Sequence, residues 1–192
     1  MRLSLTAAAV LAFSLSLGAS ARVARPLGRQ AKPETRLQEP RMWSDRDGAF
    51  SLARPDGESW RFQASAQGPD GAPLPLLAHS EETGAQLIVQ NADGVGSLRT
   101  LAGLLAAHLS EEGRIHVEEP ARIIARGGEG YAFSFTVGDE ARGRVAVVRS
   151  GDHVALVIAS WPLGAPPAVA EEVNGMIGSL GPVELKMREN VY

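Results

Sequence analysis

The stretch from Gly130 to Trp161 constrains the fold more than any other part of this 192-residue chain. Its first segment alternates large apolar residues with small or polar ones, which is the pattern of a half-buried strand; the apolar positions are Tyr131, Phe133, Phe135 and Val137. Two further strand patterns, over residues 143–149 and 153–161, each follow a short turn that contains Gly and Asp. Because strands joined by tight turns pair antiparallel, the stretch predicts an antiparallel sheet. The last strand is apolar at nearly every position, so we expect it to lie centrally with both faces covered.

Further strand patterns precede this stretch and agree with an antiparallel sheet. Residues 48–62 predict two short strands around a turn at Pro55-Asp56-Gly57, where proline fixes φ and glycine permits a tight reversal. The remaining strand patterns cover residues 74–79, 86–90 and 114–126, the last interrupted at Pro120.

Two segments have the apolar period of amphipathic helices. The first follows Ser97, a good N-cap residue, and has a stripe of Leu98, Leu101, Leu105 and Leu109. The second follows Pro166 and Pro167, stops at Gly181-Pro182, and has a stripe of Val169, Val173, Met176, Ile177 and Leu180. Both stripes require burial against the sheet. The sequence therefore predicts an α+β domain over residues 43–182, a mainly antiparallel sheet with two amphipathic helices packed on it.

Three parts of this pattern resemble the PsbP/Mog1-like family and together cover most of residues 43–182. They are FSLARPDGESWRF at residues 50–62, the helix SLRTLAGLLAAHL at residues 97–109, and the run from Gly130 through the closing helix. The resemblance implies a PsbP/Mog1-like sandwich. It also implies a non-enzymatic role, because members typically dock on large assemblies, bind small GTPases, or are bacterial periplasmic proteins of unassigned role. The family has no invariant catalytic motif, so the resemblance assigns no residue to a partner.

The first 21 residues have the three-part layout of a secretory signal peptide. Arg2 gives a positive start, an apolar stretch runs from Leu3 to Gly18, and Ala19 and Ala21 supply the small residues for cleavage. The apolar stretch is shorter than the roughly 20 residues that a membrane span requires. We therefore expect a secreted or periplasmic bacterial protein that is cleaved before Arg22 and keeps no transmembrane segment after processing.

The chain contains no cysteine. Export would permit disulfides, but none can form, and thiolate metal sites and thiol catalysis are excluded as well. A lipid-anchoring cysteine at the cleavage site is also absent, so we expect no lipid anchor.

Charge is distributed unevenly between the leader and the domain. Residues 22–42 carry six basic and two acidic side chains, a net charge of +4, and contain three prolines. Residues 43–182 carry ten arginines and 18 acidic side chains, a net charge of −8. Such an acidic domain is a poor candidate for nucleic-acid binding. We expect residues 22–42 to be a disordered basic leader, either a solvated linker or a weak contact to an anionic membrane, and residues 183–192 to be a tail.

No motif predicts a catalytic residue, a cofactor site or a metal site. The loop at residues 91–97 holds the first two glycines of G-x-G-x-x-G, but Arg99 stands at the third position, which favours a glycine-rich turn before a helix. A zinc site would need His108, Glu112 and His116 to meet; without H-E-x-x-H, a structural histidine is the better interpretation. The nucleophile motif G-x-S-x-G is absent from the chain.

The remaining candidates are two tryptophans, Trp43 and Trp161, which lie at the ends of predicted elements. An exposed ring at either position would anchor a partner; core packing or covering of a sheet edge is the structural alternative. The sequence thus predicts an exported, non-enzymatic binding or accessory module that docks on a protein or envelope partner. The alternatives are an exported hydrolase whose catalytic groups assemble only in the fold, and a carrier of a small apolar ligand.

The expected cleavage site is tested by a substitution at Ala21. Ala21→Arg places a long cation where a small side chain is required, so the precursor accumulates and the mature form is lost. Ser20→Ala is the matched control and leaves processing unchanged. Immunoblotting and N-terminal sequencing of the exported protein check this, and a mature form that starts elsewhere than Arg22 contradicts it.

Overall fold

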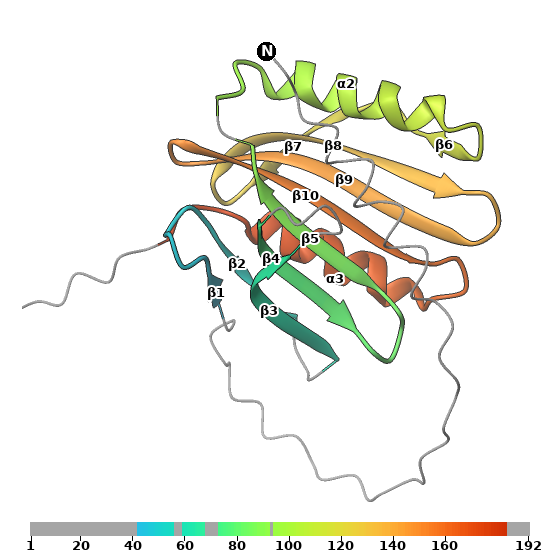
Figure 1. Cartoon of the computed structure of the whole chain (residues 1–192), viewed down its shortest axis with the longest axis horizontal. Coiled ribbons are helices and arrows are strands. Elements are labelled where there is room, and N and C mark those ends of the chain that lie inside the picture. Colours follow the sequence, from blue (N-terminus) through green and yellow to red (C-terminus); the bar gives the residue numbers. More distant parts are fainter. Residues whose placement is uncertain (1–41, 56–58, 68–72, 93, 184–192) are drawn as a thin grey trace, which may run out of the picture.

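Antiparallel pairing between neighbouring segments organises the chain around one large sheet (Figure 1). The computed structural model describes residues 42–55, 59–67, 73–92 and 94–183. Within these residues, eight strands form the sheet in the order β3-β4-β5-β10-β9-β8-β6, and β7 pairs with the same edge of β8 as β6 does. The strands are β1 (Met42–Ser44), β2 (Ser51–Ala53), β3 (Trp60–Gln67), β4 (Pro73–Ser80), β5 (Gln86–Asn91), β6 (Ile115–Val117), β7 (Ala121–Ala125), β8 (Gly128–Val137), β9 (Ala141–Ser150) and β10 (His153–Pro162). The described helices are α2 (Leu98–Glu111) and α3 (Pro167–Ser179).

β10 lies at the centre of the sheet, as its apolar sequence predicts. It pairs antiparallel with β5 along one edge and with β9 along the other. Every residue from Val154 to Ser160 is buried. A strand whose edges are paired and whose faces are both covered needs apolar side chains at consecutive positions, because neither face meets water.

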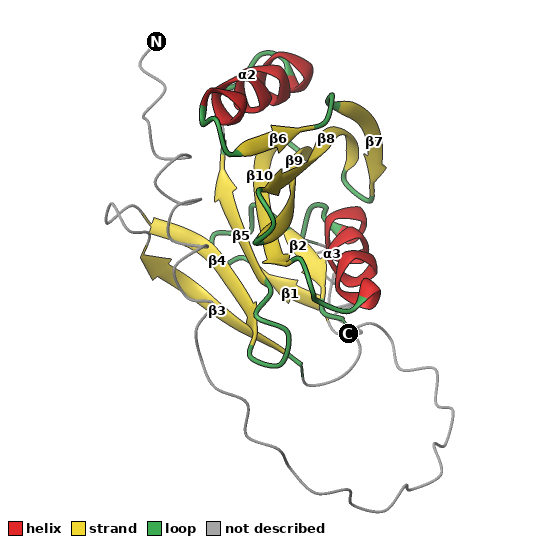
Figure 2. Cartoon of the chain, turned by 90° about the vertical axis from the view of Figure 1, so that its right-hand side faces the viewer, coloured by secondary structure: helices red, strands yellow, loops and turns green. Residues whose placement is uncertain are grey.

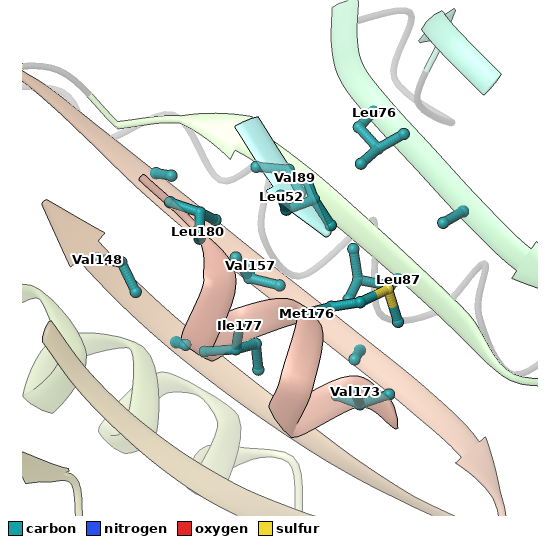
Figure 3. Packing of buried hydrophobic residues seen from close by; sticks show 14 of the residues in the cluster. Leu52, Leu76, Leu87, Val89, Val148, Val157, Val173, Met176, Ile177 and Leu180 are labelled. Atoms are coloured by element: carbon teal, nitrogen blue, oxygen red, sulfur yellow. The ribbon is translucent and has the colours of Figure 1, made fainter. Parts of the chain in front are cut away.

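The two helices cover opposite faces of the sheet (Figure 2). α2 packs over β6, β8 and β9, where Leu101 joins a buried cluster with Phe133 and Phe135. α3 packs on the other face together with the β1–β2 hairpin. Figure 3 shows Leu52 of β2 and Met176 of α3 within this second cluster. The predicted α+β arrangement, with two amphipathic helices on a mainly antiparallel sheet, is confirmed.

Both helices begin where their sequences predict. The hydroxyl of Ser97 accepts a hydrogen bond from the backbone N–H of Thr100 at 3.2 Å, which satisfies a donor that the first turn of α2 leaves free. The predicted stripe of α3 is buried along its whole length. In α2 the stripe is buried except at Leu105, which is half-buried, and Ala102 and Ala106 extend it.

The β7–β8 turn completes the C-terminus of α3. The last carbonyls of a helix have no partner within it. Here the backbone N–H of Arg126 donates to Gly178 O, the Nε of Arg126 donates to Ser179 O, and the N–H of Gly127 donates to Leu180 O. The Arg126 guanidinium also donates to the Ser51 hydroxyl at 2.6 Å, so one side chain joins the turn, α3 and β2.

The predicted hairpin over residues 48–62 is wrong in its pairing. Strands form at both places, but β2 pairs with β1, and β3 pairs with β4. The physical reason is the position of α3: Phe50 and Leu52 are buried beneath this helix, and Ser51 pairs with Gly181 just beyond it. Residues 56–58 of the expected turn lie outside the described residues.

Several predictions from the chain termini lie outside the described residues. These are the signal peptide at 1–21, the leader at 22–42 apart from its last residue, and the tail at 183–192 apart from its first residue. In the part of the chain that the structure describes, no helix has both the length and the apolar character needed to cross a membrane.

Two glycine substitutions test the packing of the sheet. Gly143 lies directly opposite Phe135, and a Cβ there would collide with the Phe135 ring and approach Ala159 O at 2.5 Å. We expect Gly143→Ala to lower the free energy of unfolding by about 1–3 kcal/mol. Gly103→Ala in α2 meets open space, so it raises that free energy by about 0.4–1 kcal/mol. Urea unfolding of both variants measures the difference, and equal effects contradict this packing.

Candidate functional site

One end of the α3 face of the sheet carries a set of exposed and half-buried side chains, most of them polar, at the edge of the buried cluster beneath α3. At this end lie the β8–β9 turn, the end of β10 and the beginning of α3 (Figure 1). We call this set the arginine surface, and it comprises Arg142, Arg144, Ser134, Thr136, Trp161 and His116.

Strand register places these side chains in neighbouring positions. Trp161 of β10 is opposite Arg142 of β9, and Arg142 is in turn opposite Thr136 of β8. Thr136 is opposite His116 of β6, which completes one row across four strands. Directly opposite residues of antiparallel strands point to the same face and interact. The row therefore forms one continuous strip of side chains.

A second row runs beside the first and closer to α3. It contains Ala159, Arg144 and Ser134, which are again directly opposite one another. Exposure falls from the first row to the second: Arg142 is exposed and Arg144 is half-buried, while Ala159 is buried in the cluster beneath α3. The arginine surface thus begins where the cover provided by the helix ends.

Neither arginine of this surface is neutralised. Among the described residues, neither Arg142 nor Arg144 forms an ion pair or a side-chain hydrogen bond, and the Nε of Arg144 is buried without an acceptor. Their Cα atoms are roughly 6.6 Å apart, since a strand rises about 3.3 Å per residue. Neighbouring like charges and an unpaired buried N–H both destabilise the folded chain. No described side chain compensates for them.

Three other arginines of the domain form ion pairs, whereas Arg46, Arg99 and Arg149 form none among the described residues. Arg61 pairs with Glu81 at 2.9 Å, and Arg122 pairs with Glu129 at 3.0 Å. Arg114 pairs with Glu140 in the β8–β9 turn, which engages a carboxylate close to the arginine surface. In a domain whose net charge is −8, two unpaired guanidinium groups on one face stand out as a local positive site.

The two tryptophans singled out from the sequence differ in their environment. Trp43 is only 7% exposed, and its ring lies 5.6 Å from that of Phe50 in the α3-face cluster. The premise of an exposed ring is therefore wrong for Trp43, because β1 folds back beneath the sheet. Trp161 is half-buried at the edge of the same cluster and belongs to the arginine surface. Partner binding at Trp161 stays a prediction.

The weaker candidates from the sequence do not come together. His108 lies on α2 and contacts Glu111 at 3.6 Å, whereas His116 lies in the row on the opposite face of the sheet. Across the described ranges, no group of three or more His, Asp or Glu side chains is placed to hold a metal ion. In the loop at residues 91–97, Ser97 caps α2, and residue 93 lies outside the described residues.

Sequence reasoning missed Arg142 and Arg144. Their signal is the Arg-Gly-Arg segment just before the apolar run Val145–Val148, because alternate residues of a strand share one face. Only the pairing of β9 with β8 and β10 places the two arginines beside Trp161 and the hydroxyl groups of Ser134 and Thr136.

Known proteins resemble this chain in structure. No family model matches it, and no curated protein matches it. The cyanobacterial PsbP (CyanoP) of Synechocystis sp. PCC 6803 is similar with a TM-score of 0.52 and 10% identity, over 80% of this chain and 98% of that one. The Ran-binding protein Mog1p of Saccharomyces cerevisiae is similar with a TM-score of 0.50 and 14% identity, over 74% of this chain and 94% of that one. These likenesses show the fold alone, and the PsbP/Mog1-like fold expected from the sequence is confirmed.

A stability measurement tests whether the arginine surface has a structural role. Arg144→Met keeps an unbranched apolar stem and removes the charge and the unpaired N–H, so we expect the free energy of unfolding to rise by about 0.5–1 kcal/mol. Arg126→Met, which removes hydrogen bonds to α3 and β2, should instead lower it by about 1–3 kcal/mol. Urea unfolding gives both changes in free energy from the shift of the transition midpoint, provided that the dependence of that free energy on urea concentration is unchanged. If Arg144→Met destabilises the domain as much as Arg126→Met does, Arg144 has a structural role and the expectation is wrong.

Proposed function

We propose that this protein is an exported, non-enzymatic accessory module that docks on a protein partner through the arginine surface. One observation carries the proposal. Arg142 and Arg144 lie beside the half-buried Trp161, and neither forms an ion pair with a described acidic side chain. Arginine and tryptophan are the side chains most often found at the energetic centres of protein interfaces. A partner carboxylate that binds the two guanidinium groups offsets the repulsion between their charges.

The fold supports a binding role by analogy. Mog1p, which shares this fold, is a Ran-binding protein. Fold similarity alone does not transfer a function, so the analogy adds only to what the site itself indicates. An exported hydrolase and a carrier of a small apolar ligand remain the alternatives, and no arrangement among the described residues favours either of them over docking.

Export rests on the sequence of the leader. The three-part signal pattern of residues 1–21 supports a processed protein that works outside the cytoplasm. The basic residues of the segment at 22–42 would then precede the acidic domain as a tether.

Site-directed photo-crosslinking tests the docking role. A photoreactive phenylalanine derivative at position 136 lies within the arginine surface, and the same group at position 63 of β3 is the control on the opposite face. In the native envelope fraction, we expect one discrete crosslinked product from position 136 and none from position 63. The Arg142→Ala/Arg144→Ala double variant should lose that product. The proposal fails if both positions give the same products, or if the product survives in the double variant.

A further inference from the structure

We propose that the arginine surface binds an extended acidic protein segment that presents carboxylates on alternate residues. This inference rests on the proposed docking role and adds the chemistry of the partner. It follows from the spacing of the two arginines, from the hydrogen-bonding geometry of their guanidinium groups, and from the charge of the surrounding domain.

The spacing of the two arginines matches that of alternate residues in an extended chain. Arg142 and Arg144 point to the same face of β9 with one residue between them. In any extended segment, side chains that share a face recur every two residues, at the same distance of roughly 6.6 Å. A peptide lying along β9 with Glu or Asp at alternate positions therefore meets the two guanidinium groups one to one. Adjacent carboxylates point to opposite sides of an extended peptide and cannot do so.

Guanidinium groups suit carboxylates in particular. The planar fork of arginine donates two parallel hydrogen bonds to one carboxylate, and such charge-assisted bonds are stronger than neutral ones. The strand fixes the Cα positions of both arginines, and packing buries the Nε of Arg144, so part of that side chain is held in place before a partner binds. Pre-ordering of this kind reduces the entropy lost on binding.

The neighbouring side chains define the two borders of the site. Trp161 lies on the β10 side of Arg142 and offers an apolar ring, while Thr136 and Ser134 lie on the β8 side and offer hydroxyl groups. Glu118 also lies near, because its backbone N–H donates to Ser134 O, yet it forms no ion pair with either arginine. Among the described residues, both guanidinium groups thus lack a carboxylate partner.

The charge of the domain favours a short acidic segment over an extended polyanion. With a net charge of −8 over residues 43–182, the domain repels an anionic membrane or a nucleic acid at long range. Two arginines are also few beside the rows of phosphate contacts that such surfaces require. A short segment with a few carboxylates contacts the two arginines and avoids most of the acidic surface of the domain.

Peptide binding to the full chain tests this inference. The probe is a short capped peptide of alternating Glu and Thr, followed by fluorescence anisotropy at low and physiological ionic strength. Its matched control has the same composition in a repeated Glu-Glu-Thr-Thr order, so that no two Glu residues stand two positions apart. We expect the alternating peptide to bind about tenfold more tightly than this control, and its affinity to fall as salt is added.

Variants locate the binding site. Arg142→Ala/Arg144→Ala should weaken binding of the alternating peptide by at least about tenfold, and Arg142→Lys/Arg144→Lys should weaken it by several-fold, because lysine keeps the charge and loses the fork. Arg99→Ala/Arg149→Ala removes the same charge from exposed positions outside the surface, and it should change affinity by less than about twofold. Urea unfolding confirms that each variant is folded.

Three outcomes overturn the inference. These are equal affinity for the two peptides, binding that survives in Arg142→Ala/Arg144→Ala, and tighter binding of anionic phospholipid vesicles than of the alternating peptide through the same arginines. The photo-crosslinking experiment separates this inference from the proposed function. If position 136 crosslinks a partner that the alternating peptide does not displace, docking stands and the acidic-segment inference fails.

Discussion

Burial of β10 on both faces is the constraint on which the rest of the structure depends. Its two edges are fixed by β5 and β9, and its side chains alternate between the cluster beneath α2 and the cluster beneath α3. Val157 faces α3, and Ile158 faces α2. Because the strand is apolar on both sides, each helix must cover one face, and neither helix can be removed without exposing the centre of the sheet to water.

The positions of the two ends of α3 decide which part of this face of the sheet is covered by the helix and which part is not. Its C-terminus is held by Arg126 and Gly127 of the β7–β8 turn and lies next to β2. Its N-terminus begins only at Pro167, after the chain has left β10. The sheet beyond that point is left with Arg142 and Arg144 in place of apolar residues. The same packing that stabilises one end of the α3 face therefore leaves exposed and half-buried arginine side chains at the other end.

Predictions from periodicity succeeded where local pattern and tertiary environment agree. The hairpins from β8 to β10 and both helix stripes could be read from the chain, because a turn joins each strand to its pairing partner and each stripe meets the sheet. The hairpin expected over residues 48–62 did not form, because β2 pairs with β1 and is held by Gly181, more than a hundred residues away. Trp43 is not the exposed ring that partner binding requires, because β1 pairs with β2 and this pairing places Trp43 in the buried core.

The sequence by itself determined the class of fold, the central position of β10, the two amphipathic helices and the signal pattern, because each depends on residues that are neighbours in the chain. It also placed Trp161 among the candidates. Only the tertiary structure decided that Trp161, Arg142 and Thr136 lie in one row, since they belong to three different strands. Only the tertiary structure shows that no described acidic side chain pairs with Arg142 or Arg144, because ion pairing depends on distances between side chains that strand register and helix position set.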